Sequence, residues 1–165
     1  MVPSTWKEEV AQHIQSLSYR DKLILVVGGV KRQDSVRRGL YHLSQAVEIV
    51  LVHDGARPFT PPDLISRVIG VTRKHGACVP VLSVTDTVKE VSEELVLRTV
   101  SREVLGLAQT PQGFDVSLLK RAFDQAEKDG FYGTDEAALV ERLNEPIYIV
   151  SGDKANIKIT EVEDL

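Results

Sequence analysis

Apolar residues along this chain follow two patterns: short continuous runs, and longer segments in which they recur every three or four positions. Residues 23–27, 49–52 and 77–84 are runs of the kind that form strands buried on both faces. Between these runs, helical spacing predicts helices over residues 10–17, from Ser35 onward, and over residues 64–75. Strands that are apolar on both faces need helices above and below them. This half of the chain therefore predicts an α/β fold with a doubly wound, mostly parallel sheet.

The pattern changes after residue 84, where two β-branched runs stand close together. Residues 85–91 and 95–100 are separated by three polar residues, which is typical of a β-hairpin. A lone two-stranded ribbon is marginally stable in water, so the hairpin is expected either to pack on its own domain or to reach a second subunit as an arm. The residues alone leave both interpretations open.

The last third of the chain returns to helices and strands. Helices are predicted over residues 115–128 and 134–143, and strands over residues 147–150 and 157–159. Thr134 is expected to cap the second of these helices, because threonine is a favoured capping residue and two acidic residues follow it in the first turn.

Composition excludes several classes of protein. The 165 residues are 42% hydrophobic, but no unbroken apolar stretch reaches the ~18 to 20 residues of a membrane span, so one domain with no membrane partner is expected. No basic segment followed by an apolar run opens the chain, which predicts a cytoplasmic location. A net charge of −4 and a pI near 5.6 argue against nucleic-acid binding. The single cysteine, Cys78, lies in an apolar run and is expected to be a buried, inert thiol.

The segments that follow the predicted strands carry the candidate chemistry, because ligands of open α/β sheets bind beyond the carboxyl ends of strands. Gly28 and Gly29 would let a ligand approach the backbone closely, and the helix expected near Ser35 would offer free amides to an anion or a base edge. A simple strand-ending turn is the alternative. Lys31 and Arg32 favour phosphate.

A denser group of functional residue types lies in residues 53–58, with the sequence HDGARP. A carboxylate at the end of a strand, here Asp54, is well placed to hold Mg²⁺ together with phosphate oxygens and water. Arg57 can grip a phosphate by two parallel hydrogen bonds. The competing interpretation is an Asp54 that caps the turn and pairs with Arg57. His53 is expected to be a packing or hydrogen-bonding residue.

Further polar residues stand at the ends of predicted elements, where side chains can converge on a pocket. They are Arg102, Thr110, Gln112, Thr134, Asp135 and Lys158. Each has an ordinary structural alternative, such as helix capping for Thr134 or the solvent side of a strand for Lys158. Together with the loops above, they predict a phosphate or nucleotide site with a divalent cation.

These motifs, taken in order, resemble one enzyme family. The segments that match are residues 28–36, 52–58, 86–89, 99–102, 109–112, 134–136 and 156–160. They resemble the 2-C-methyl-D-erythritol 4-phosphate cytidylyltransferases of the non-mevalonate isoprenoid route. The resemblance covers nearly the whole chain and implies a Rossmann-like fold of the nucleotidyltransferase type with a protruding β-hairpin arm.

The resemblance assigns one group of residues to CTP, the co-substrate. Gly29 and Ser35 would contact the cytosine and its ribose, and Arg32 would support this side of the nucleotide. Asp54 would bind the Mg²⁺ that bridges the CTP phosphates. Gly28 and Gly55 would complete the CTP site.

The resemblance assigns a second group to the sugar-alcohol phosphate that accepts CMP. This group consists of Arg57, Thr87, Arg102, Thr110, Thr134 and Lys158. Lys158 would lie near the reacting phosphates, and the catalytic residues would be Lys158, Asp54 and Arg102. Thr87, Arg102 and Thr110 match residues that the family presents across a dimer interface, which implies a homodimer formed through an arm of residues 84–104.

The chain departs from the family at its ends. The family opens with a strand and a Gly-rich loop of the form A-A-G-x-G-x-R-x-G, followed by a Pro-Lys-Gln segment, and closes with a helix; neither end is matched here, and Ser101 stands where many members have Asp. Residues 1–165 are therefore expected to be a single nucleotidyltransferase domain, truncated at both ends and inactive alone, because that loop stabilises the charge that develops on the phosphates.

Two other functions remain open from the sequence. A ribitol 5-phosphate cytidylyltransferase would share the features of residues 53–58 and 35–39. A non-catalytic nucleotide-binding or dimerising module would be the outcome if the loop had been lost.

Overall fold

The computed structural model describes residues 1–164, which form two compact units. The first unit comprises Met1–Val50 and Val116–Glu145, and the second comprises Leu51–Asp115 and the chain from Pro146 onward. The α/β class predicted from the sequence is confirmed. The single domain expected over residues 1–165 stays a prediction.

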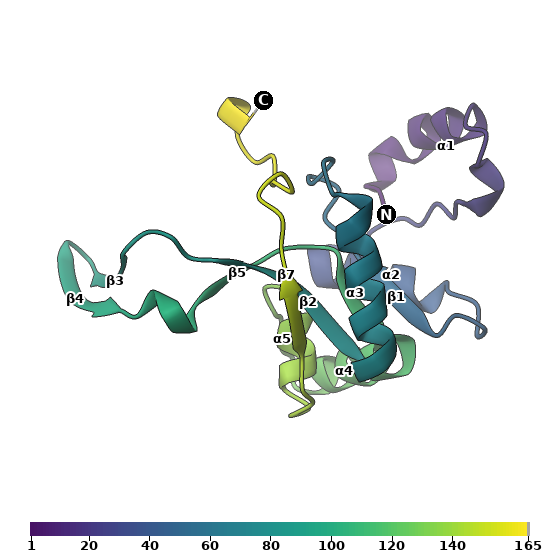
Figure 1. The fold of residues 1–165 in the computed structure, drawn as a ribbon. Helices are drawn as coiled ribbons and strands as arrows, with labels where there is room; N and C mark the ends of the chain where they lie inside the picture. Colours follow the sequence, from purple (N-terminus) through teal and green to yellow (C-terminus); the bar gives the residue numbers. More distant parts are fainter. Residues whose placement is uncertain (165) are drawn as a thin grey trace. The chain divides into compact units, whose positions relative to one another are not determined.

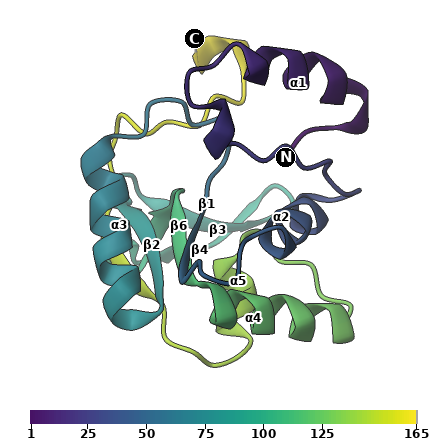
Figure 2. The same ribbon diagram turned by 90° about the vertical axis from the view of Figure 1, so that its right-hand side faces the viewer.

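The first unit is helical. Its elements are the 3₁₀ turns Ser4–Trp6 and Arg20–Lys22 and the helices α1 (Lys7–Gln15), α2 (Arg32–Tyr41), α4 (Val116–Lys128) and α5 (Ala137–Glu141). Within this unit, α4 lies beside α2 and α5 (Figure 2). Its buried apolar side chains are spaced as the 3.6-residue helical period requires, at Val116, Leu119, Ala122, Phe123 and Ala126.

The second unit contains most of the sheet. Its elements are α3 (Pro62–His75), β2 (Ala77–Ser83), β3 (Val88–Ser92), β4 (Leu95–Val100), a 3₁₀ turn (Arg102–Val104), β5 (Gly106–Ala108), β6 (Gln112–Asp115), β7 (Tyr148–Ser151) and a final 3₁₀ turn (Val162–Asp164). Strand β1 (Ile49–Val52) enters this unit with its second half. The strand order is β1-β6-β2-β5, with β7 also paired to β2.

Strand β2 is the centre of this sheet. Its two ends pair antiparallel with β6 (Ala77 opposite Phe114) and with β5 (Val81 opposite Ala108). Its middle pairs parallel with β7, from Cys78 opposite Tyr148. The mostly parallel sheet that was predicted is therefore mostly antiparallel in the described pairings. The chain leaves β2 through the hairpin and turns back along β2 as β5 and β6.

Helix α3 covers β2 and β6 and forms the core of the second unit (Figure 2). Leu64 and Val68 are fully buried against Cys78. Gly113 on β6 has no room for a side chain, because a Cβ there would lie 2.2 Å from the Thr72 hydroxyl oxygen. Burial raises the pKa of the Cys78 thiol to about 11, which confirms the buried and inert cysteine predicted from the sequence.

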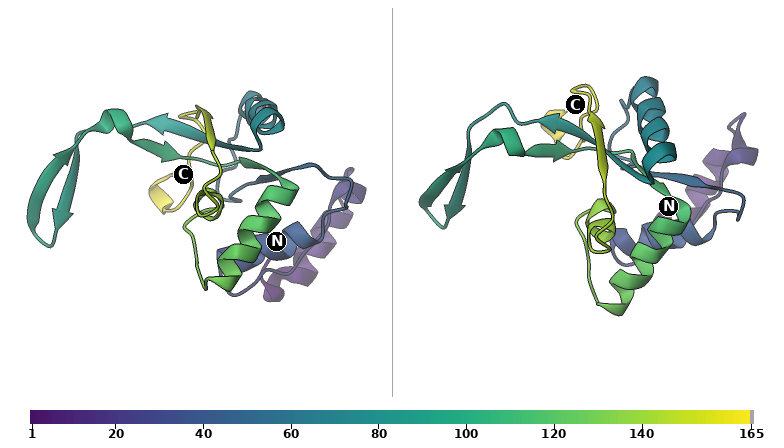
Figure 3. Two further views of the ribbon diagram at one scale, coloured as in Figure 1. Left: turned by 90° about the horizontal axis from the view of Figure 1, so that it is seen from below. Right: turned by 60° about the horizontal axis from the view of Figure 1, so that its bottom comes forward.

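The hairpin of β3 and β4 extends away from the sheet of the second unit (Figures 1 and 3). Its register runs from Val88 opposite Val100 to Ser92 opposite Leu95, and the turn places Glu93 at a φ of 51°. Several of its apolar side chains are exposed, namely Val91, Leu95, Val96 and Leu97. This exposure fits the arm better than a hairpin packed on its own unit, and the arm that reaches a second subunit stays a prediction.

Two predicted strands and one predicted helix differ most from the structure. Residues 23–27 form no strand, because their described pairing is limited to one parallel bridge between Val27 and Val2. Residues 157–159 form no strand either: within residues 1–164, their described main-chain pairing is the bond from Ile159 N to Ala56 O (2.8 Å). The helix predicted over 134–143 is shorter and has Glu136, not Thr134, at its N-cap position; the Asp135 side chain accepts the Ala138 amide in its first turn (3.0 Å). An apolar run forms a strand only where its main chain can hydrogen-bond to a neighbouring strand.

Candidate functional site

The loop after β1 holds a carboxylate beside two cations. The Asp54 Oδ2 atom lies 3.0 Å from the Lys158 Nζ atom and 3.9 Å from the Arg57 Nε atom. The Asp54 side chain is 15% exposed and that of Lys158 is 44% exposed. The structure thus brings Lys158 beside Asp54 and Arg57, two residues that the sequence singled out in one segment, and it leaves Lys158 accessible to an anion.

Arg57 has donor capacity to spare. Its Nη1 atom donates to the main-chain oxygen of Asn156 (2.7 Å). Within the described part of the chain, its buried Nε–H group has no hydrogen-bond partner. A buried donor without a partner is costly, so this group would gain free energy from an acceptor such as a phosphate oxygen.

Thr110 and His53 line the other side of the Asp54 backbone. The Thr110 hydroxyl accepts the Asp54 amide (3.0 Å) and lies 3.0 Å from His53 Nδ1. The second ring nitrogen of His53 lies 3.0 Å from the Arg57 carbonyl oxygen. His53 is therefore a hydrogen-bonding residue of the loop, as expected. Thr110, assigned by resemblance to a dimer interface, is buried within its own chain.

In the first unit, Ser35 organises the glycine turn. Helix α2 begins at Arg32 and not at Ser35, because Asp34 accepts the Lys31 amide (3.0 Å) and closes the first turn earlier. The Ser35 hydroxyl accepts the Gly29 amide (2.9 Å) and donates to the Lys31 carbonyl (3.1 Å). Gly29 must lack a side chain, since a Cβ would lie 2.3 Å from that of Asp34.

A buried carboxylate that the sequence analysis did not select as a site residue holds Arg32. The Arg32 guanidinium donates two parallel hydrogen bonds to Glu136, of 2.7 and 2.9 Å. The Glu136 side chain is 1% exposed and that of Arg32 is 40% exposed. Burial raises the pKa of Glu136, and the hydrogen bonds from Arg32 oppose that shift. In the sequence, the only signal for Glu136 was its position next to Thr134 and Asp135 in the segment 134–136, which matches the family.

Gln33 was also missed, and it fastens the loop before α5 to α2. Its side chain donates to the Phe131 carbonyl (3.0 Å) and accepts the Gly133 amide (2.9 Å). Next to it, the Lys31 ammonium lies 3.4 Å from the centre of the Tyr132 ring. Thr134, the predicted site residue in this loop, follows directly and is exposed.

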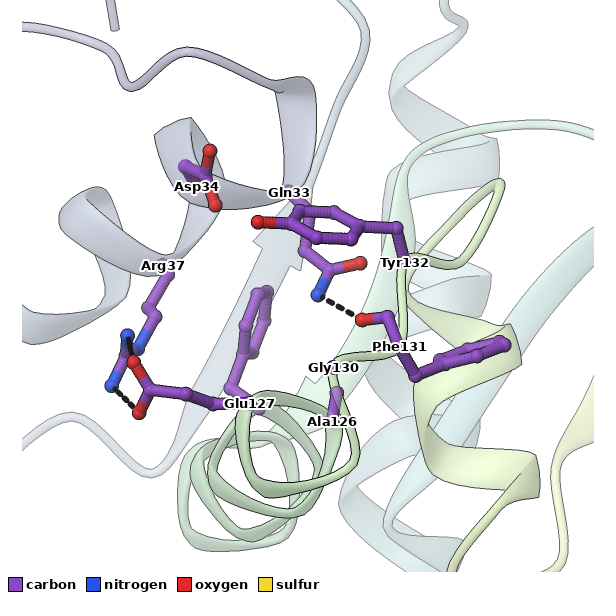
Figure 4. Close-up of a pocket in the computed structure, with 9 residues that line it drawn as sticks. Gln33, Asp34, Arg37, Ala126, Glu127, Gly130, Phe131 and Tyr132 are labelled. Carbon is purple, nitrogen blue, oxygen red and sulfur yellow. Dashed lines mark hydrogen bonds and ion pairs between the residues drawn. The ribbon is translucent and has the colours of Figure 1, made fainter.

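A small cavity of about 100 Å³ lies between this loop, α2 and α4 (Figure 4). Its lining residues are Gln33, Asp34, Arg37, Phe123, Ala126, Glu127, Gly130, Phe131 and Tyr132. Arg37 and Glu127 face one another across a bidentate ion pair, shown by dashed lines in Figure 4. None of the predicted site residues lines this cavity.

The remaining predicted residues lie elsewhere in the second unit. Gly55 is exposed in the loop after β1. Thr87 is exposed where the hairpin arm begins. Arg102 follows β4 and donates to the Thr85 carbonyl, across the base of the arm. The structure therefore does not bring Thr87 and Arg102 into the Asp54 cluster of their own chain.

Two findings bear on binding classes. Among residues 1–164, no group of three or more His, Cys, Asp or Glu side chains is arranged to hold a metal ion. None of the described helices has the length and apolar character needed to cross a bilayer.

Comparison with known proteins gives a consistent family. The family model described as 2-C-methyl-D-erythritol 4-phosphate cytidylyltransferase (IspD) matches residues 5–165. A protein of that name from Acidobacterium capsulatum is 44% identical over 163 residues, which cover 96% of this chain and 68% of the relative. One from Bacillus cytotoxicus is 44% identical over 152 residues, which cover 92% and 67%. The chain thus spans about two thirds of the length of these relatives.

Solved structures agree with the family. The enzyme of the same name from Thermus thermophilus superposes with a TM-score of 0.80 at 42% identity, covering 86% of this chain and 68% of that one. The 4-diphosphocytidyl-2C-methyl-D-erythritol synthase of Anaerococcus prevotii superposes with a TM-score of 0.90 at 30% identity, covering 99% and 75%. The described fold is therefore similar to that of nucleotidyltransferases.

Proposed function

The chain belongs to the 2-C-methyl-D-erythritol 4-phosphate cytidylyltransferase family, and from that premise we propose that it transfers CMP from CTP to 2-C-methyl-D-erythritol 4-phosphate. A phosphate oxygen of the acceptor attacks the α-phosphorus of CTP and forms a new P–O–P link. The bond from the α-phosphorus to the bridging oxygen breaks, and pyrophosphate leaves. The observation that carries the proposal is the cluster of Asp54, Lys158 and Arg57 at the carboxyl end of β1.

In such a transfer, negative charge moves between phosphate oxygens, and side chains form few covalent bonds. The main task of the protein is therefore to neutralise this charge. Lys158 is assigned to the reacting phosphates, which its accessible ammonium supports. Arg57 is assigned to the acceptor phosphate, which its unused Nε–H supports. Thr110 and Thr134 are proposed to contact the acceptor, and Asp54 holds Lys158 in place before substrates bind.

Mg²⁺ is proposed as the divalent cation, with Asp54 as its protein ligand. Magnesium usually takes one or two carboxylates and completes its shell with phosphate oxygens and water. The partly buried carboxylate of Asp54 at the end of β1 fits that mode. When bound, the ion would neutralise the triphosphate and orient it.

CTP recognition is proposed for the glycine turn of the first unit. Gly28, Gly29 and Ser35 would meet the cytosine and ribose, Arg32 would support them, and Gly55 would lie near the phosphates. The hydrogen bond from Gly29 to the Ser35 hydroxyl supports a preformed backbone at this turn. A backbone that is already ordered loses less freedom on binding, which favours affinity.

A homodimer is proposed through the hairpin arm of residues 84–104. Its exposed apolar side chains and marginal stability as an isolated ribbon support a partner surface. Thr87 and Arg102 at the base of the arm would then contribute to the acceptor site of the second subunit, with Arg102 among the catalytic residues.

A pyrophosphate-release assay on the full-length protein tests the proposed function. CTP, Mg²⁺ and 2-C-methyl-D-erythritol 4-phosphate are expected to release pyrophosphate and form the cytidine diphosphate conjugate. Ribitol 5-phosphate in place of the acceptor is expected to reduce kcat/KM at least ~10²-fold, since polar groups built for one acceptor are left unpaired by another. Faster turnover of ribitol 5-phosphate would reassign the acceptor, and no turnover of either would refute the proposal.

Ser35→Ala is expected to raise the KM for CTP about fivefold and leave kcat within about threefold. The hydroxyl orders the Gly29 amide. A contact made equally in ground and transition states changes KM rather than kcat, and one hydrogen bond is worth about 1 kcal/mol. Ser66→Ala is the control, because the exposed Ser66 hydroxyl bonds only within its own helix, to Pro62. An unchanged KM would remove Ser35 from the CTP site.

A further inference from the structure

Two side-chain amides lie buried behind the Asp54 cluster in the second unit. Gln109 is 4% exposed and Asn156 is fully buried. Burying a side-chain amide costs free energy unless its donors and acceptors are hydrogen-bonded. The partners of these two amides lie in the loop between β5 and β6, in the loop after β1 and in the segment after β7. Gln109 donates to the Asn156 carbonyl (3.2 Å), donates to the Asp153 carbonyl (2.9 Å) and accepts the Asp153 amide (3.0 Å).

Asn156 connects three loops that are distant in sequence. Its Nδ2 group donates to the Thr110 carbonyl in the loop between β5 and β6 (2.8 Å). Its Oδ1 atom accepts the Thr60 hydroxyl from the loop after β1 (2.8 Å). Its own carbonyl, in the segment after β7, accepts from Arg57 (2.7 Å).

These bonds determine where the charged groups stand. Lys158 is two residues beyond Asn156, and Asp54 lies in the same loop as Thr60 and Arg57. Residues 157–159 belong to no strand, so their position depends on the Asn156 contacts and on the bond from Ile159 N to Ala56 O (2.8 Å). The buried Asn156 side chain thus contributes bonds to both of the segments that carry Lys158 and Asp54, whose Nζ and Oδ2 atoms lie 3.0 Å apart.

We propose that Asn156 is a positioning residue for the transfer reaction. It does not touch substrate; it sets the distance between Lys158 and Asp54 by fixing both of their loops to the Thr110 backbone. The consequence for catalysis rests on the proposed function, whereas the consequence for geometry does not. Displacing a catalytic group by about 1 Å can cost ~10²-fold in rate.

Thr60 provides a matched pair of variants that does not delete the buried amide. Thr60→Val keeps the shape but removes the hydroxyl that donates to Asn156, and Thr60→Ser keeps the hydroxyl. Thr60→Val is expected to lower kcat about tenfold with the KM for CTP within twofold, and Thr60→Ser to stay near wild type. Asn156→Ala is expected to lower kcat about 10²-fold. All rates are measured at least 15 °C below each variant's Tm.

Crystal structures of the Thr60→Val and Thr60→Ser proteins give a readout that does not need turnover. Thr60→Val is expected to open the contact between Lys158 Nζ and Asp54 Oδ2 beyond 4 Å, while Thr60→Ser keeps it. A lowered Tm with unchanged kcat would show a merely structural role and overturn the proposal. So would a lowered kcat with the contact intact, or a displaced contact with normal kcat. Absence of turnover in the wild type would refute the proposed function, and the Lys158 position would still decide this inference.

Discussion

Asp54→Ala in the full-length protein is expected to lower kcat for CMP transfer at least ~10³-fold, with a smaller effect on the KM for CTP. Under the proposed function, Asp54 would hold the metal and act on charge that is greatest in the transition state, so its loss is expected to lower kcat. The same change removes the partner of Lys158 and Arg57, whose 3.0 and 3.9 Å contacts with Oδ2 orient them. Pyrophosphate release at saturating CTP and a series of Mg²⁺ concentrations measures the effect.

Asp63→Ala is the matched control for this change. Asp63 is also a carboxylate paired with an arginine, Arg67, but it lies on the surface of α3 with its side chain 78% exposed. Its loss is expected to change kcat by less than twofold. Near-normal turnover of Asp54→Ala at saturating Mg²⁺ would show that Asp54 holds neither the metal nor Lys158 in the reaction.

Arg32→Ala is expected to lower the free energy of unfolding by about 2 kcal/mol at pH 8. The change leaves the Glu136 carboxylate, with a side chain that is 1% exposed, without the guanidinium that donates two hydrogen bonds to it. Losing one partner of a fully buried pair costs about 3–5 kcal/mol, and the 40% exposure of Arg32 reduces that figure through solvent screening. Urea unfolding followed by circular dichroism measures the loss.

The loss is expected to be smaller at pH 5. Burial already raises the pKa of Glu136, and removing Arg32 removes the hydrogen bonds that oppose this shift. A carboxyl with a higher pKa in the folded state binds more protons folded than unfolded, so stability falls as pH rises from the unfolded pKa toward the folded one. The deficit of Arg32→Ala relative to wild type should therefore grow between pH 5 and pH 8.

Arg37→Ala is the control on the same helix. Arg37 also forms a bidentate pair, but its partner Glu127 is 59% exposed, and exposed pairs contribute about 0–1 kcal/mol. This variant should lose less than about 1 kcal/mol, with little change between the two pH values. Equal losses in both variants, or a deficit of Arg32→Ala that does not depend on pH, would contradict the assignment of Glu136 as a buried charge held by Arg32.

Local patterns in the sequence determined most of the elements. The strand Ile49–Val52 and helices α3 and α4 begin and end within two residues of their predicted bounds. The spacing of apolar residues indicates which side of a helix or strand faces the core, and this holds whichever other elements form that core. The segment 53–58 was found from its place after a buried strand, and Asp54 and Arg57 of that segment lie together in the structure.

Pairing between strands could not be predicted in the same way. Residues 23–27 are as apolar as β1, yet their described pairing is one bridge to Val2, and Leu23 and Ile24 are exposed. Conversely, β5 and β6 are three and four residues long and contain glycine, so their sequence carries almost no strand signal. A segment forms a strand only when its main chain hydrogen-bonds to a neighbouring strand, and which strand becomes its neighbour depends on the fold of the whole chain.

Only the tertiary structure decided which polar residues meet. Arg32 and Glu136 are 104 positions apart, and Asn156 and Thr110 are 46 apart. The sequence marked Arg32 as a residue that favours phosphate and Thr110 as a polar group at an element end, but it could not distinguish Glu136 from the exposed Glu127. The difference arises when folding removes water from one carboxylate and not from the other, because the group that loses water must find its partner in the protein.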